Sequence, residues 1–346
     1  MLMSPMTLNI MITSLLASTT IVVSNHHWLL VWVGLELNTM SIMPMIIKSH
    51  HPHATEAATK YFLVQTAAAA LILFAGTQNT WKTGQWTFTY TPSPSTTMIM
   101  LATMLKLGLA PVHFWYPDVL QGSTLLMALT ISTWQKLAPL TILYMISQTP
   151  STAMLTMGLI SALVGGWTGL NQTQMRKLLA FSSIAHMGWL LTALTINPKL
   201  ATLTLIIYIL TTTATFLILS PTTMTTTLDL SSTHSSHPTL TMALMLLVLS
   251  LGGLPPLSGF MPKWLILNEL VAQNLVQLAT LLALASLPSL YFYLRITFVT
   301  MLMAPPNTAT TELKWRFKLT PSLALMMTAP LATLMLPLAP PLTHTL

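Results

Sequence analysis

The chain has 346 residues, of which 53% are hydrophobic and 5% are charged, whereas soluble domains carry about 25% charged residues. This composition excludes an ordinary water-soluble globule. The net charge of +7 comes from basic residues scattered singly or in pairs, so it does not predict a nucleic-acid surface. The absence of cysteine excludes disulfides, thiolate-held iron–sulfur clusters and cysteine zinc sites within this chain.

Apolar runs follow one another along the whole sequence. A helix needs about 20 mostly apolar residues to cross the hydrocarbon core of a bilayer, and unpaired backbone groups are costly there. The alternation typical of a membrane β-barrel is absent. We therefore predict an all-α integral membrane protein of about eleven transmembrane helices, with no soluble domain. The predicted spans are 3–23, 28–47, 61–76, 97–115, 124–146, 152–170, 178–194, 200–219, 240–270, 275–303 and 323–342.

The connections between these spans carry unequal charge on the two membrane faces. With an odd number of spans, seven basic residues fall on the amino-terminal face and two on the other, so the positive-inside rule places the amino terminus on the cytoplasm-like side. The first nine residues contain no Arg or Lys, and we expect neither a secretory signal nor an Arg-rich transit peptide. The first set is Lys48, Lys60, Arg176, Lys177, Lys314, Arg316 and Lys318, and the second is Lys82 and Lys199.

Four ionisable residues stand out inside or beside predicted spans: Glu36, Lys106, Lys136 and Lys263. A charge at membrane depth costs about 2.5 to 3.5 kcal/mol on insertion scales, so each is a candidate functional residue. One carboxylate cannot neutralise three lysines, and at least one lysine must therefore titrate or face water. This pattern predicts a proton relay. A buried structural ion pair between Glu36 and Lys106 is the alternative.

Two predicted spans are interrupted by similar motifs. Gly108 and Pro111 interrupt the fourth span, and glycines at 252–253 with prolines at 255–256 interrupt the ninth. Proline removes a backbone donor and clashes one turn back, so both helices should be discontinuous. Freed backbone is tolerated at depth only where it is buried in protein or lines a watery cavity.

Matching broken helices in two halves favour an inverted-repeat transporter with an ion path near the membrane midplane. The five-span spacing between the breaks gives the two repeats opposite orientations. We predict a single transmembrane domain, 1–346, with a first repeat at about 1–147, a second at about 150–303 and a carboxyl-terminal helix at about 320–342.

Several histidines and span-end charges have weaker signals. His113 and His186 could relay protons near neutral pH, although hydrogen-bonded packing is the alternative for each. The cluster of His50, His51 and His53 has no acidic or cysteine companion except Glu56, and we predict no metal site there. We expect Asp118, Glu269 and Arg295 to anchor or pair at the interface. No nucleotide-binding or hydrolase motif is present.

Six stretches of the sequence resemble the mitochondrially encoded NADH dehydrogenase subunit 2 family of vertebrates, and the likeness runs over essentially the whole chain. They are HWLLVWVGLE (27–36), ATEAATKYF (54–62), WQKLAP (134–139), GWTGLNQTQ (166–174), SSIAHMGW (182–189) and GGLPPLSGFMPKW (252–264).

The resemblance implies a Mrp antiporter-like membrane-arm subunit of respiratory complex I, the proton-pumping NADH:ubiquinone oxidoreductase. It implies the mitochondrial inner membrane, with the amino terminus in the matrix and the carboxyl terminus in the intermembrane space. NADH, FMN, iron–sulfur clusters and ubiquinone would act in other subunits, with no cofactor or metal in this chain. The implied partners are neighbouring antiporter-like and small core subunits and lipids such as cardiolipin, and no nucleic acid.

The same resemblance implies roles for individual residues. Glu36 and Lys106 would form the ion-handling pair of the first repeat, Lys136 a bridge, and Lys263 the lysine of the second broken helix. His186 resembles a histidine on the central polar axis of the family. Two rival functions stay open at this point, a stand-alone cation/proton antiporter and a passive membrane scaffold.

Overall fold

The protein is mostly helical over the residues that the computed structural model describes. These are 5–48, 51–87, 93–147, 152–222, 224–230, 233, 237–302 and 322–338. The named elements of this part are α-helices and short 3-10 helices, and extended pairing is limited to two isolated bridges. The predicted all-α class is confirmed. Four residues that the sequence analysis considered lie outside the described ranges. They are Lys314, Arg316 and Lys318, which were assigned to the amino-terminal face, and His50 of the histidine cluster.

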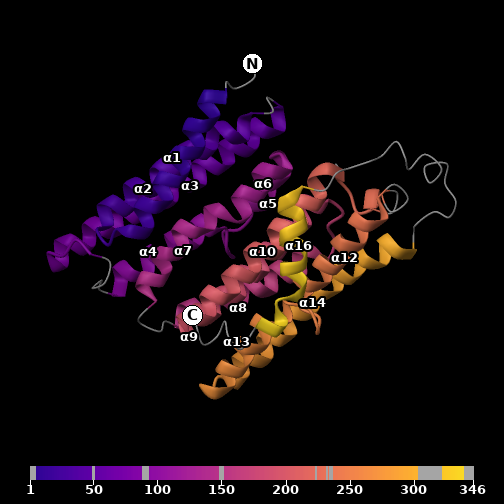
Figure 1. Ribbon diagram of the computed structural model, residues 1–346. Helices are drawn as coiled ribbons and strands as arrows, with labels where there is room; N and C mark the ends of the chain where they lie inside the picture. The colour runs from indigo at the N-terminus through magenta and orange to yellow at the C-terminus, as the bar shows by residue number, and fades with distance from the viewer. Residues whose placement is uncertain are drawn as a thin grey trace. The chain divides into compact units, whose positions relative to one another are not determined.

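The chain divides into two compact units, Met1–Ser151 and Thr152–Leu346. In the first, α1, α2 and α3 pack side by side, and α3 also contacts α4 and α5 (Figure 1). Its elements are α1 (Pro5–Ser24), α2 (Trp28–Ile47), α3 (Pro52–Thr83), α4 (Ser93–Leu107), α5 (Trp115–Gly122), α6 (Leu125–Ser132), η1 (Trp134–Lys136) and α7 (Leu137–Ile146).

In the second unit, α9 packs against α8, α10 and α13, while the carboxyl-terminal α16 contacts α10 and α12. Its elements are α8 (Thr152–Gly169), α9 (Met175–Ile196), α10 (Pro198–Thr222), α12 (Pro238–Gly252), α13 (Phe260–Ala272), α14 (Val276–Leu302), α16 (Leu323–Leu334) and η3 (Leu336–Leu338). The predicted repeats end close to the boundary between the units, and their inverted relation stays a prediction.

Seven of the described helices are long and apolar enough to cross a membrane, namely α1, α2, α3, α8, α9, α10 and α14. Two shorter apolar helices, α12 and α16, also fall in predicted spans. The predicted runs at 124–146 and 240–270 are each divided between two α-helices, and in the run at 97–115 helix α4 ends at Leu107, which is why these runs are missing from the long set. The chain is a multi-pass membrane protein.

Both predicted helix breaks are confirmed. The helix before each break, α4 or α12, ends in the same way. Gly108 and Gly253 adopt φ values of 70° and 78° just after α4 and α12. In the first break, Gly108 N donates to Leu105 O at 3.2 Å and Leu109 N donates to Met104 O at 3.1 Å. In the second, Gly253 N donates to Ser250 O at 3.0 Å. These bonds form Schellman caps, which need a left-handed residue that glycine supplies without strain.

A third break, in the predicted fifth span, was not predicted. The α-helical ladder of α6 stops at Ser132, and the 3-10 turn η1 intervenes before α7. The signal is Pro139, which has no N–H to give the Gln135 carbonyl four residues earlier. This break matters because η1 carries Lys136.

Small residues bring α8 and α9 into close contact. A Cβ at Gly188 would lie 2.6 Å from Gly158 O and 2.7 Å from Ala162 N. A Cβ at Gly165 would lie 2.6 Å from Ala185 N. Lipid tails are as apolar as leucine side chains, so the hydrophobic effect does not drive membrane helices together. Close packing of this kind drives their association instead.

We expect the Gly188→Ala substitution to lower the free energy of unfolding by about 1 to 3 kcal/mol, because its methyl group would overlap backbone atoms of α8. The measurement is detergent-induced unfolding of the chain in mixed micelles. Ala153→Val enlarges an exposed residue of α8 and should change the stability by less than about 0.5 kcal/mol. Equal effects of the two substitutions would contradict tight α8–α9 packing.

Candidate functional site

Two of the predicted lysines share one cavity in the first unit. The Lys106 and Lys136 side chains are 6% and 3% exposed, and both line a cavity of about 20 Å³. A cavity of this size holds about one water molecule. The other residues that line it are Leu35, Asn38, Thr39, Tyr61, Gln65, Leu107, Trp115, Tyr116, Ile131, Gln135 and Pro139.

Lys106 is held at the first helix break by a two-way contact with α3. Its Nζ lies 3.5 Å from Gln65 O as donor, and Gln65 Nε2 donates to Lys106 O at 3.3 Å. Lys106 belongs to the last turn of α4, where the helix dipole favours a cation. The break thus places an amine at a helix carboxyl end with a carbonyl partner on a neighbouring helix.

Lys136 reaches the same cavity from the unpredicted 3-10 turn. Its Nζ lies 5.2 Å from the centre of the Tyr116 ring, within the range of a cation–π contact. Tyr116 belongs to α5, the second half of the first broken helix. Both breaks of this unit therefore contribute to the surroundings of Lys136.

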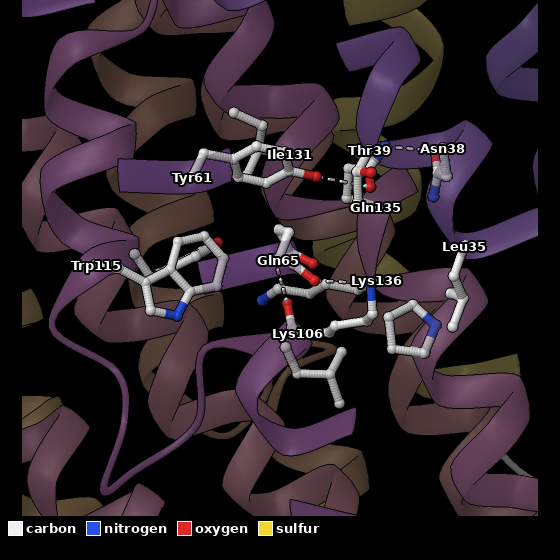
Figure 2. A pocket seen from close by; sticks show the side chains of 13 residues that line it. Leu35, Asn38, Thr39, Tyr61, Gln65, Lys106, Trp115, Ile131, Gln135 and Lys136 are labelled. Carbon is white, nitrogen blue, oxygen red and sulfur yellow. Dashed lines mark hydrogen bonds between the residues drawn. The ribbon is translucent and has the colours of Figure 1, made fainter. Parts of the chain in front are cut away.

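A row of uncharged polar side chains runs along the cavity. Tyr61 donates to Gln135 Oε1 at 3.3 Å, and Gln135 Nε2 donates to Asn38 Oδ1 at 2.8 Å. Figure 2 shows this row above Gln65, Lys106 and Lys136. Sequence reasoning missed these residues, although amide side chains within otherwise apolar spans were a signal, since they need hydrogen-bond partners in hydrocarbon.

Glu36 lies beside this cavity without lining it. Its helix neighbour Thr39, which does line the cavity, places its hydroxyl 2.8 Å from the Glu36 carbonyl and 3.2 Å from its carboxylate. Glu36 itself is half-buried. The structure thus places Glu36 next to a cavity residue, and its grouping with Lys106 stays a prediction.

The alternative of a direct Glu36–Lys106 ion pair is not formed. Ion pairs within 4.0 Å in the described part of the chain join Lys60 to Glu56 and Asp118, and His53 to Glu56. The Lys60–Asp118 pair, at 2.8 Å, ties α5 to the start of α3. Asp118 thus pairs as expected.

The second unit brings Lys263 and His186 to one cavity, also of about 20 Å³. Lys263 Nζ donates to Gly252 O at 2.8 Å, which is the carboxyl end of α12 across the second break. The His186 ring lies 5.8 Å from that of Tyr208 on α10. The remaining lining residues are Trp189, Thr204, Ile207, Thr211, Ser250, Leu251, Gly259, Pro262 and Ile266.

Other singled-out residues take structural positions. His113 is buried in the first break, with Nδ1 3.3 Å from Pro111 O, and lines neither lysine cavity. His51 Nδ1 accepts a hydrogen bond from His53 N at the start of α3. Arg295 on α14 donates to the carbonyls of Leu170 and Gln172 after α8. Among the residues described, no three metal-ligating side chains gather.

Comparisons with known proteins agree on one family. Residues 25–288 match the family model for the membrane part of NADH:quinone oxidoreductase and Mrp antiporters, and residues 290–343 match the model for the NADH dehydrogenase subunit 2 C-terminus. The chain is 48% identical to NADH-ubiquinone oxidoreductase chain 2 of Xenopus laevis, over 98% of this chain and 99% of the relative.

Solved structures share the fold. A chain of respiratory complex I from Thermus thermophilus aligns with a TM-score of 0.83 at 27% identity, covering 97% of this chain and 79% of that one. A chain of the Mrp complex from Dietzia aligns with a TM-score of 0.82 at 16% identity, covering 97% and 76%. The second likeness shows the fold alone.

The Gln135–Asn38 bond can be tested with a double-mutant cycle. We expect Asn38→Leu and Gln135→Leu to be coupled by about 0.6 kcal/mol in the free energy of unfolding, and by no more than about 1.7 kcal/mol, as for other hydrogen bonds between membrane helices. The measurement is again unfolding in mixed micelles. Thr20→Val, at an exposed position of α1, should combine additively with Gln135→Leu. Additive effects of Asn38→Leu and Gln135→Leu would contradict a stabilising bond.

Proposed function

The chain belongs to the NADH dehydrogenase subunit 2 family and is a membrane subunit of complex I, and from that premise we propose that it carries protons across the inner mitochondrial membrane. The route would use Glu36, Lys106 and Lys136 in the first unit, and Lys263 with His186 in the second. It would be driven by electron transfer from NADH to ubiquinone elsewhere in the complex.

One observation carries the proposal: Lys106 and Lys136 are almost fully buried and border one water-sized cavity. A permanent charge at membrane depth is costly, and two like charges beside one cavity repel each other. The arrangement therefore favours a state in which one amine is protonated and the other is a proton acceptor. A water molecule between them would complete a path for the proton.

Glu36 supplies the charge that can bias this pair. A carboxylate close to Lys106 stabilises the protonated amine, and movement of Glu36 toward or away from Lys106 would strengthen or weaken that effect. Moving one elementary charge across 100 mV costs about 2.3 kcal/mol, and one pKa unit corresponds to about 1.36 kcal/mol. Changes of one or two pKa units, caused by the pairing of Glu36 with Lys106, are therefore the right scale for a gate.

The row of Tyr61, Gln135 and Asn38 suits a supporting role. Amide side chains do not titrate near neutral pH, so they cannot hold the transferred proton. They can fix the rotamers around Lys136 and orient water in the cavity through their hydrogen bonds. Lys263 would act in the second unit, where its amine donates a hydrogen bond to the Gly252 carbonyl and His186 borders the same cavity.

The surroundings of the chain follow from the same family membership. We place the amino terminus in the matrix and the carboxyl terminus in the intermembrane space, in line with the charge asymmetry of the connections. Neighbouring antiporter-like and small core subunits, with lipids such as cardiolipin, would surround it. NADH, FMN, iron–sulfur clusters and ubiquinone would act in other subunits.

Replacement of Lys106 tests the relay. We expect Lys106→Met in the assembled complex to lower the number of protons pumped per NADH oxidised, because the cavity loses one of its two titratable amines. Proton uptake and NADH oxidation are measured together in sealed vesicles. Lys82→Met removes the same charge from an exposed position at the end of α3 and should leave the ratio unchanged.

Three outcomes separate the rival functions. An unchanged ratio in Lys106→Met would contradict the relay. A lower yield of assembled complex with normal pumping per complex, above all in Lys136→Met, would favour a passive scaffold. Folding and ion exchange by the isolated chain, without any other subunit, would favour a stand-alone antiporter.

A further inference from the structure

The second helix break is bonded to the carboxyl-terminal helix. Ser258 lies in this break and is fully buried. Its hydroxyl donates to Ala332 O, and its backbone N–H donates to Thr333 O at 3.2 Å. Both acceptors belong to the last turn of α16, whose final residue is Leu334.

The end of α16 has free acceptors for a physical reason. The last four carbonyls of an α-helix have no partner within the helix. Thr333 O would receive the N–H of residue 337 if α16 continued, but that residue is proline and has no N–H to give. The two bonds from Ser258 therefore satisfy carbonyls that the helix itself leaves unpaired.

The same break is pressed against α12 on its other side. A Cβ at Gly259 would lie 1.7 Å from Ser250 O, so only glycine fits at this contact. Residues 258–259 are thus enclosed between the last turns of α12 and α16. Helix α13 begins at the next residue, Phe260.

Lys263 lies in the first turn of α13, directly after this enclosed segment. Its bond to Gly252 O spans the break, so its length depends on where α13 starts relative to the end of α12. The two bonds to α16 help to fix that start. Helix α16 itself lies beyond residues 25–288, the part that matches the general antiporter model.

We propose that the carboxyl end of α16 and Ser258 form a latch that positions Lys263 for proton transfer. This inference rests on the proposed function of Lys263 as a relay residue. Ser258 is a positioning residue, since it touches no transferred proton and acts through the start of α13. In this view α16 gives the subunit an added control over its second relay lysine.

Two substitutions release the latch from opposite sides. Ser258→Ala removes the hydroxyl donor to Ala332 O. Pro337→Ala supplies an N–H that competes for Thr333 O without altering the break. Loss of one ordinary hydrogen bond shifts the balance between latched and released states by about fivefold.

Each substitution has a matched control. Ser183→Ala removes a buried hydroxyl whose bond, to Ala180 O at 2.7 Å, lies within α9. Pro330→Ala restores an N–H in α16, two residues before Ala332, that would face Met326 O. The Met326 side chain is exposed, and the acceptors of the latch are Ala332 O and Thr333 O.

The first readout does not depend on pumping. The chain has no cysteine, so Leu257→Cys in the break introduces the only thiol of this subunit. We expect a water-soluble maleimide to label it about fivefold faster in the intact complex when Ser258→Ala or Pro337→Ala is also present, and no faster with either control. Unchanged labelling in both latch variants would overturn the inference.

The second readout is the number of protons pumped per NADH oxidised by the assembled complex. We expect both latch variants to lower this ratio at a normal amount of complex, and both controls to leave it unchanged. A purely structural role would lower the amount of complex and keep the ratio. Faster labelling with an unchanged ratio would support the latch itself and contradict a relay role for Lys263.

Discussion

Hydrocarbon offers no hydrogen bonds, so each backbone or side-chain polar group that this chain brings to membrane depth must find its partner inside the protein. The breaks at Gly108 and Gly253 each end a helix, and the buried amines of Lys106 and Lys263 belong to residues at these breaks. Lys106 lies at one helix end with Gln65 O as acceptor, and Lys263 binds the carbonyl of Gly252. The broken helices and the lysines are thus two parts of one solution.

The two units use this solution in different ways. In the first, the cavity gathers two lysines and a row of amide and phenol side chains, because a 3-10 turn adds Lys136 to the surroundings of Lys106. In the second, Lys263 meets His186, and the break is also bonded to α16.

In each unit, contacts outside the cavity hold the helices that line it. Glycines and alanines on α8 and α9 bring two helices into backbone contact, and His186 lies on the α9 segment between two such contacts, at Ala185 and Gly188. The Lys60–Asp118 ion pair joins α5 to α3 on the first unit, and α5 carries the Tyr116 ring over Lys136. The positions of the titratable groups in the cavities thus depend on contacts that lie outside the cavities.

The sequence by itself determined the helical membrane class, the seven long apolar helices and the two predicted breaks, because apolar run length, glycine and proline act locally on the backbone. The total of about eleven spans stays a prediction. It also singled out Glu36, Lys106, Lys136, Lys263 and His186, since a charge in an apolar run is visible without coordinates. The third break and the amide row were not predicted, although each has a local signal in the sequence. Pro139 is the signal for the break, and Gln135 is the signal for the row. Only the tertiary structure decided that Lys106 and Lys136 border one cavity, that Glu36 is in none of the ion pairs of the described residues, and that Ser258 meets α16. Those outcomes depend on which helices pack together, and residues far apart in sequence become partners only through that packing.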